Sequence, residues 1–267
     1  TASNLVESDR LPRRIVCPNK SPGPRIEVHR MSDASNEIGR VYLDGNATTR
    51  PFPEVIETVA HHLRFSYANP GSRHAEGRQA RRALEDAREK IAALLGAAPE
   101  EVIFTSGGTE STNAAIFGFC QANSGSIALT AGEHPATIES CKQLEARGYS
   151  LLKMGVDESG RLLEDQYESL PWDELRLATL ILAHNETGVI QNVAPLITAA
   201  NEKGVPTHID AVQAVGKIPI DFRKMGATSL ALAAHKFHGP RGIGALLLRQ
   251  GANIAPIQFG GHQEAGR

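Results

Sequence analysis

The sequence predicts an α/β protein with a mostly parallel sheet and helices on both of its faces. After Gly96, short apolar segments of strand length alternate with amphipathic or alanine-rich segments of helical length. The apolar segments are continuous, as is typical of strands covered on both faces. The chain has 267 residues, of which 41% are hydrophobic, so it can bury a core of this size. The expected strands span residues 102–105, 126–130, 150–154, 178–183, 207–210, 229–233 and 244–248.

The part of the chain before the sheet differs in composition. Residues 1–40 are rich in Arg, Pro, Ser and Asn and lack apolar periodicity, which predicts a disordered leader. Met31 stands just before the first patterned segment, and this raises the hypothesis that residues 1–30 are not native. Residues 41–52 are expected to form an N-terminal arm, and residues 53–267 the main domain.

Two elements are expected before the sheet begins. From Val41 the chain predicts a short strand, a turn at 44–46 and a helix that starts near Pro53. Between residues 72 and 95, apolar residues recur at helical spacing, and Gly96 supplies the stop. We expect this helix to be scaffold. Its apolar positions are Ala80, Leu84, Ala87, Ile91 and Leu94, and its solvated outer face holds Arg81, Glu85, Arg88 and Glu89.

The charge balance argues against polyanionic partners. The chain has 28 Lys and Arg residues against 30 Asp and Glu residues, and the two signs are interleaved throughout. No basic field is therefore expected for a nucleic acid or an acidic membrane surface. No apolar run approaches the roughly 20 residues of a membrane span, and no secretion signal stands at the front, so a cytoplasmic location is expected by default.

The cysteines and histidines predict no metal or disulfide framework. Cys17, Cys120 and Cys141 are widely spaced and odd in number, which indicates a reducing compartment. Ten histidines invite a metal hypothesis, but no HExxH or paired CxxC spacing occurs, so no metal site is expected.

Polar residues gather just after the expected strands. Ligands of open α/β sheets bind at the carboxyl ends of the strands, so these residues are the candidates for a site. They are the run SGGTES at 106–111, Glu133 with His134, the run HNE at 184–186, Asp210 with Gln213, and His235 with Lys236.

Three of these positions suggest one chemistry. The run at 106–111 opens a helix and offers free N–H groups and hydroxyls, which suits a monophosphate, although an ordinary N-cap turn would look the same. Asp210 can hold a pyridine nitrogen protonated, or can simply cap a turn. Lys236 can form an imine with a carbonyl cofactor, or can extend to solvent. Together they have the layout of a pyridoxal 5′-phosphate site.

The chain resembles the cysteine desulfurase and selenocysteine lyase family, within the class V aminotransferase fold. The resemblance runs in order from Val41 to the end of the chain and implies a fold-type I large domain like that of aspartate aminotransferase. Its motifs are YLDGNATT at 42–49, FTSGGTES at 104–111, GEHPA at 132–136, HNETGV at 184–189, HIDAVQAVGK at 208–217, AHKFHGPRGIGAL at 234–246 and FGGHQE at 259–264.

The resemblance implies roles for five residues around the cofactor ring. Lys236 would bind the cofactor's aldehyde and Asp210 would pair with the pyridine nitrogen. Asn185 and Gln213 would hydrogen-bond around the phenolic oxygen. His134 would stack on the ring and assist proton transfer, so Lys236 and His134 are the candidate catalytic residues. For His134 and Gln213 taken singly, a structural role remains the alternative.

The resemblance also implies a phosphate site. Gly108, Thr109 and His235 would hold the phosphate, although His235 alone reads equally well as a structural residue. Ala233 stands where the family often has a serine, which would remove one hydroxyl and weaken cofactor retention modestly. Val212 stands where the family commonly has a small or hydroxyl residue.

The activity implied is removal of sulfur from L-cysteine, giving L-alanine and an enzyme persulfide for iron–sulfur cluster assembly or thiolation. Lys236 would act as the base at Cα. A sulfur-acceptor or scaffold protein and a second copy of the chain, in a homodimer, are the implied partners. Selenocysteine lyase activity, with L-selenocysteine as substrate, is the alternative within the fold.

The end of the chain raises a further expectation. The chain stops at Arg267, where the family continues into most of a small domain that carries the nucleophilic cysteine; residues 41–52 would be the arm of that domain. None of the three cysteines matches the nucleophile, and Cys120 and Cys141 read as core residues. The chain alone is therefore expected to be inactive in sulfur transfer. A non-catalytic cofactor-binding fragment or dimer scaffold is the alternative from another class.

Overall fold

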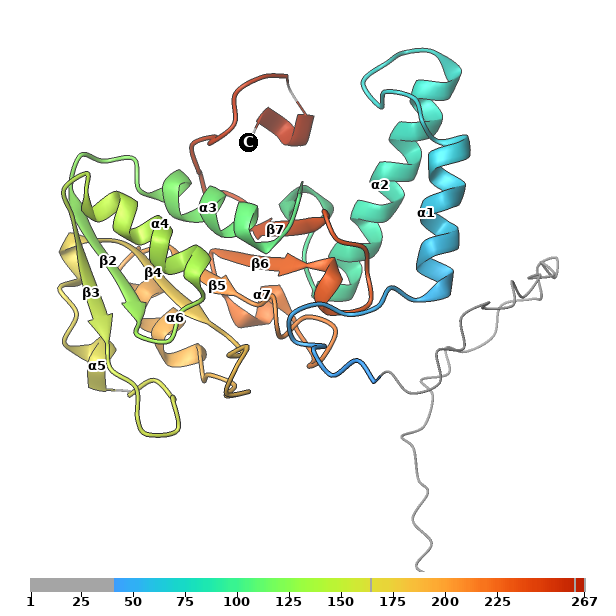
Figure 1. The fold of residues 1–267 in the computed structure, drawn as a ribbon. Coiled ribbons are helices and arrows are strands. Elements are labelled where there is room, and N and C mark those ends of the chain that lie inside the picture. The colour runs from blue at the N-terminus through green and yellow to red at the C-terminus, as the bar shows by residue number, and fades with distance from the viewer. Residues whose placement is uncertain (1–40, 164, 262, 267) are drawn as a thin grey trace, which may run out of the picture. The chain divides into compact units, whose positions relative to one another are not determined.

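A seven-stranded mixed sheet carries the fold, in the order β1-β7-β6-β5-β4-β2-β3 (Figure 1). Every neighbouring pair is parallel except those made by β7, which runs antiparallel to both β6 and β1. The predicted α/β class with a mostly parallel sheet is confirmed. The strands are β1 Val102–Thr105, β2 Gly125–Thr130, β3 Tyr149–Met154, β4 Leu175–Ile181, β5 Thr207–Asp210, β6 Ser229–Ala233 and β7 Gly244–Leu248.

The computed structural model describes residues 41–163, 165–261 and 263–266. The predicted disorder of residues 1–40 and the proposed native start near Met31 lie outside the described residues. Residues 42–267 form one compact unit, to which the description below applies. Within the described ranges, no helix has the length and apolar character needed to cross a membrane.

Helices cover both faces of the sheet. Helices α3 and α4 pack on one face against Ile127, Leu177 and Leu246, while α6, α7 and the end of α2 pack on the other face around Leu180, Ile209 and Leu230 (Figure 1). Strands β5, β6 and β7 are buried along their whole length, and the mainly apolar sequences of β6 and β7 are typical of such strands. The helices are α1 Pro53–Phe65, α2 Ala75–Leu95, α3 Gly108–Phe119, α4 Pro135–Glu145, α5 Asp165–Glu168, α6 Ala194–Glu202 and α7 Phe222–Met225.

The expected strand at the start of the arm is wrong. Residues 41–44 have no strand pairing, and a turn follows in which Ala47 N donates to the carbonyl of Asp44. The arm crosses the loop after β6 instead of joining the sheet. Thr49 N donates to His235 O in that loop at 2.8 Å. Its backbone groups are thus satisfied by a loop rather than by a strand. The assignment of 41–52 to a small domain stays a prediction.

Helix α2 departs from its predicted amphipathic pattern at two residues. Arg88, expected on the solvated face, has a side chain only 11% exposed, and it pairs with Glu264 at 2.8 Å. Leu94, expected on the apolar face, is 79% exposed. Arg88 is buried because the last described segment, with the 3-10 helix Gln263–Gly266, returns to α2 and covers its charged side. Nothing in the described structure explains the exposure of Leu94. Gly96 ends the helix at φ 66°, as predicted.

Candidate functional site

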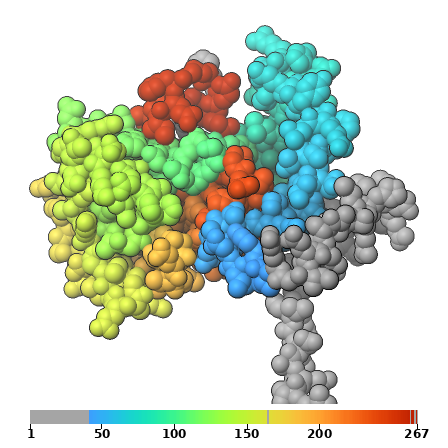
Figure 2. All heavy atoms as spheres, in the orientation of Figure 1, coloured from blue at the N-terminus to red at the C-terminus, as the bar shows by residue number. Residues whose placement is uncertain are grey.

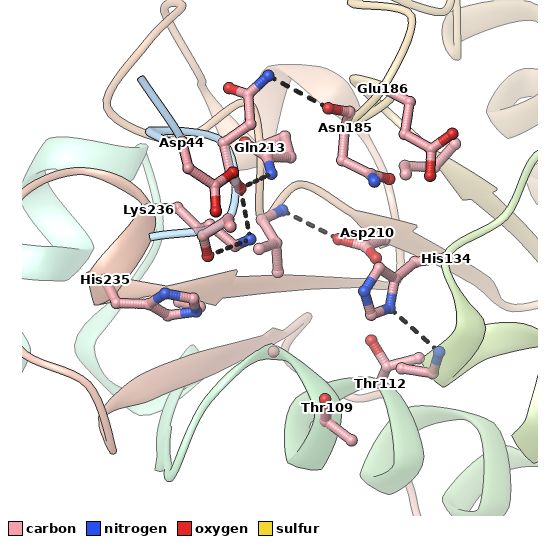
Figure 3. Close-up of a pocket in the computed structure, with 17 residues that line it drawn as sticks. Asp44, Thr109, Thr112, His134, Asn185, Glu186, Asp210, Gln213, His235 and Lys236 are labelled. Carbon is pink, nitrogen blue, oxygen red and sulfur yellow. Dashed lines mark hydrogen bonds between the residues drawn. The ribbon is translucent and has the colours of Figure 1, made fainter. Parts of the chain in front are cut away.

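All eight predicted site residues line a single cavity of about 510 Å³. It opens at the carboxyl ends of β4, β5 and β6 and is bordered by the first turns of α3 and α4 and by the turn of the arm (Figure 3). Figure 2 shows the arm, in blue, lying against the loop that follows β4, where Asn46 Nδ2 donates to Asn185 O at 3.2 Å. Segments from across the whole described chain therefore meet here. The predicted lining residues are Gly108, Thr109, His134, Asn185, Asp210, Gln213, His235 and Lys236.

Asp210 is a buried carboxyl group at the end of β5. Its side chain is 4% exposed, and its Oδ1 accepts a hydrogen bond from Val212 N at 3.0 Å. Burial raises the pKa of Asp210, and the Val212 N–H together with the charges of His134 and Lys236 opposes that rise. Within the described part of the chain, Oδ2 has no hydrogen-bond donor. A protonated ring nitrogen in the cavity would supply one.

Lys236 ends the 3-10 turn Ala234–Lys236 that follows β6. Its Nζ donates to two carbonyl oxygens of the arm, Asn46 O at 2.7 Å and Ala47 O at 3.0 Å. Burial lowers the pKa of Lys236, and the nearby charge of Lys217 lowers it further. A larger share of this amine is therefore neutral near pH 7 than in an ordinary lysine. A neutral amine is the form that attacks a carbonyl carbon.

The first turn of α3 forms a cradle for an anion. Gly108 and Thr109 begin the helix and line the cavity, and their backbone N–H groups have no acceptor among the described residues. The backbone of Gly108 lies against the side chain of Val212, in the loop after β5. A Cβ atom added to Gly108 would lie only 2.5 Å from Val212 Cγ2. The sequence alone gave no effect for valine at position 212. In the structure, Val212 limits the size of the residue that fits at position 108.

Two histidines border the cavity in defined states. His134 caps α4, where its Nδ1 accepts from Ala136 N at 3.1 Å, so the neutral ring carries its proton on Nε2. His235 lies 3.1 Å from Thr48 Oγ1 through its Nδ1, and burial lowers its pKa. The neutral His235 ring can still donate one N–H to an anion.

The two amide side chains are held by the arm and by a lysine. Gln213 Nε2 donates to Asn46 O at 2.7 Å, and its Oε1 accepts from Lys217 Nζ. The backbone oxygen of Asn185 accepts a hydrogen bond from the Asn46 side chain. The side-chain amide of Asn185 is not used in this contact and lies at the cavity wall (Figure 3). One N–H of Gln213 Nε2 has no acceptor among the described residues, and the Asn185 amide is free, so both side chains can donate to a ligand.

Sequence reasoning missed several residues of the wall. Asp44 and Asn46 were predicted only as a turn, and their place in the cavity wall depends on contacts between residues far apart in the sequence. Thr112 could have been found, since it lies one helical turn after Gly108 and Thr109. Glu186, which belongs to the run HNE named among the candidates, also lines the cavity.

The cysteines lie away from the cavity. Cys120 and Cys141 are buried free thiols in the core beneath α3 and α4, as predicted. Burial raises the pKa of each to about 12, so neither is a thiolate near neutral pH. Cys17 lies outside the described residues. In the part of the chain that the structure describes, no group of three or more His, Cys, Asp or Glu side chains is placed to hold a metal ion.

The residues present fit a phosphorylated pyridine aldehyde. Such a molecule has an anionic phosphate, a ring nitrogen that binds a proton, and an aldehyde carbon. The cavity places an N–H cradle, a buried carboxyl with a free oxygen, and an amine of lowered pKa around one volume. Fold and site together are those expected of the large domain of a fold-type I protein.

Comparison with known proteins gives the family. The sequence profile described as "Aminotransferase class-V" matches residues 41–265, and the chain belongs to this family. A cysteine desulfurase of Enterobacter agglomerans is 47% identical over 230 residues, which is 85% of this chain and 57% of that relative. This chain therefore spans a little over half the length of the relative.

Solved structures agree with the assignment. A "NIFS-LIKE PROTEIN" is 37% identical and superposes with a TM-score of 0.83, covering 85% of this chain and 64% of that one. "SspA in complex with cysteine" is 34% identical with a TM-score of 0.81, covering 84% of this chain and 66% of that one. Both confirm the fold class, and the second was solved with cysteine bound.

Proposed function

We propose that this chain carries the cofactor site of a pyridoxal 5′-phosphate-dependent cysteine desulfurase. The reaction removes sulfur from L-cysteine, releases L-alanine and leaves a persulfide for iron–sulfur cluster assembly or thiolation. The observation that carries the proposal is the convergence of Lys236, Asp210 and the α3 cradle on one cavity. The cysteine desulfurase relatives, and the neighbour solved with cysteine, support this reaction over others of the class.

The chain's residues divide the work of holding the cofactor. Bound pyridoxal 5′-phosphate supplies an aldehyde that combines with amines and a ring that accepts electrons from Cα. In the proposal, Gly108, Thr109 and His235 bind the phosphate, and the Asp210 carboxylate keeps the ring nitrogen protonated. Asn185 donates from its side-chain amide to the phenolic oxygen.

Lys236 and His134 move protons. Lys236 must leave the carbonyls of Asn46 and Ala47 to reach the cofactor, and its lowered pKa favours the neutral amine that removes a proton from Cα. His134 carries its proton on Nε2, since Ala136 N occupies Nδ1. The neutral ring can therefore donate a hydrogen bond from Nε2 into the cavity and assist proton transfer there.

The thiol that accepts the sulfur is neither Cys120 nor Cys141 in this proposal. Both are buried, outside the cavity and protonated near neutral pH. A sulfur-acceptor or scaffold protein, a homodimer and a cytoplasmic location complete the proposal. The first two rest on the family resemblance, and the location is the expectation from the sequence.

The test is spectroscopic and covalent. The chain, mixed with pyridoxal 5′-phosphate, is expected to show the visible absorption of an imine. Borohydride reduction should fix the cofactor mass on the peptide that contains Lys236, and Lys236→Ala should lose both signals, whereas Lys142→Ala, an exposed lysine, should keep them. Absence of the band in the unmodified chain, or its persistence in Lys236→Ala, would refute the cofactor assignment.

Substrate choice is tested by the spectral change on adding amino acids. L-Cysteine should shift the band, and L-selenocysteine is the competing candidate. A shift only with kynurenine or a keto acid would overturn the desulfurase assignment.

A further inference from the structure

A fully buried histidine lies behind the cavity, on the same strand as Asp210. His208 of β5 is 0% exposed and, two residues before Asp210, points to the same face of the sheet, toward α3. Its Nδ1 is 2.9 Å from Ser229 Oγ on β6. Its Nε2 is 3.4 Å from Thr112 Oγ1 on α3. One ring therefore joins two strands of the sheet to the helix that forms the cradle.

The contacts of Ser229 favour one direction for each hydrogen bond in this chain. Ser229 Oγ also contacts the carbonyl oxygen of Thr207 at 3.2 Å, and a carbonyl can only accept. All three groups are satisfied when Ser229 donates its single hydroxyl proton to Thr207 and accepts from His208 Nδ1–H. A neutral ring then has a lone pair on Nε2, which accepts the hydroxyl proton of Thr112. Burial lowers the pKa of His208 to about 3, so the ring is neutral.

A second buried contact anchors the same turn of α3. Ser111 Oγ lies 2.8 Å from Thr105 Oγ1 on β1. Neighbouring residues 111 and 112 thus tie the helix start to β1 on one side and to β5 and β6 on the other. Apolar packing lets a helix shift, whereas hydrogen bonds weaken steeply when their geometry changes. The two polar anchors hold the first turn, with Gly108 and Thr109, in one position on the sheet.

We propose that His208 is a positioning residue that holds the anion cradle of α3 at a fixed distance from Asp210. The inference rests on the proposed function, because a phosphorylated pyridine has a fixed distance between its phosphate and its ring nitrogen. Both ends bind well only if the cradle and the carboxylate keep the matching separation. The link from Thr112 through His208 to Ser229 sets that separation from behind the cavity.

The first test measures the tautomer of His208 without any ligand. In protein with ¹⁵N-labelled histidine, the ring-nitrogen spectrum should show the proton of His208 on Nδ1, with the signal assigned by its loss in His208→Asn. Ser229→Ala removes the acceptor and should move the proton to Nε2, where Thr112 can accept it. A proton on Nε2 in the unmodified chain, or no change in Ser229→Ala, would overturn the directed chain.

The second test separates positioning of the phosphate from general damage. Thr112→Val is nearly isosteric and removes one hydroxyl, and His208→Asn keeps a donor toward Ser229 but cannot reach Thr112. Each should weaken pyridoxal 5′-phosphate binding by roughly 2- to 12-fold, the range for one neutral hydrogen bond. Pyridoxal, which lacks the phosphate, should bind as before. Thr112→Ser should retain full affinity, and the double variant should lose no more than either single one.

The two ligands keep the outcomes distinct. Equal loss for pyridoxal and its phosphate, or no loss in His208→Asn, would refute the positioning role. Failure of the unmodified chain to bind pyridoxal 5′-phosphate would refute the proposed function instead, and the tautomer spectrum would still report on the hydrogen-bond chain.

Discussion

Substitution of Gly108 by alanine tests the tightest contact at the cofactor cradle. The added Cβ would lie 2.5 Å from Val212 Cγ2, whereas ordinary carbon contacts are about 3.5 to 4.0 Å. Val212 is β-branched and has few alternative rotamers. Its backbone N–H also binds Asp210 at 3.0 Å, so a shift of the loop would disturb the buried carboxylate.

The expected cost follows from these contacts. Overpacking of this kind costs about 1 to 3 kcal/mol, and alanine recovers up to about 1 kcal/mol of helix propensity over glycine. We therefore expect Gly108→Ala to lower the free energy of unfolding by up to about 3 kcal/mol. Cofactor affinity should fall with it, because the cradle and Asp210 both move.

Urea unfolding of a double-mutant cycle gives the measurement. Val212→Ala should restore most of the stability and cofactor affinity of Gly108→Ala, because it removes the opposing methyl group. Gly45→Ala is the matched control, since its Cβ would meet nothing within 4 Å, and it should change stability by less than about 0.5 kcal/mol. Additive effects of the two substitutions in the cycle would refute the steric argument.

Two further predictions concern buried or half-buried carboxylates. Burial raises the pKa of Glu133 from 4.5 to about 7. Between these two pH values the folded state therefore binds more protons than the unfolded state. The free energy of unfolding should fall by up to about 3 kcal/mol as the pH rises from 4.5 to about 7. Glu133→Gln should remove that slope in unfolding measured at pH 5 and pH 7.5; an unchanged slope would contradict the assignment. Glu264→Gln breaks the half-buried pair with Arg88 and should cost about 1 to 3 kcal/mol in urea unfolding. The exposed pair of Glu139 and Lys142 is the control, and Glu139→Gln should cost less than about 1 kcal/mol; equal losses would show that Arg88 is not a structural anchor.

The strands of the sheet were predictable because the pattern of apolar residues within each strand indicates its burial. Four of them, β1, β5, β6 and β7, have the predicted bounds, and in β1, β6 and β7 a mainly apolar run ends in polar residues or glycine. The arm and Arg88 could not be predicted in the same way. Val41 to Leu43 look like a strand, and Arg88 looks solvated, until the partner segment from elsewhere in the chain is known.

In the candidate site, too, some residues were predictable from local sequence and others depend on contacts with distant segments. Its eight predicted residues follow strands or open helices, so the rule for open α/β sheets places them together. The acceptors of the Lys236 amine are backbone carbonyls, which carry no sequence signal. His208 looked like an ordinary member of an apolar strand, and its link to Thr112 depends on how α3 lies across the sheet.

The carbonyls that hold Lys236 also bear on the order in which the protein folds. Asn46 and Lys236 are 190 residues apart, so closing this contact costs loop entropy that local contacts do not. During synthesis the arm leaves the ribosome long before its partner strand end exists. The sheet can assemble first, and the lysine side of the cavity closes only when the arm docks. Docking of the arm onto Lys236 should therefore be a late kinetic phase in refolding, after the β-sheet signal has recovered.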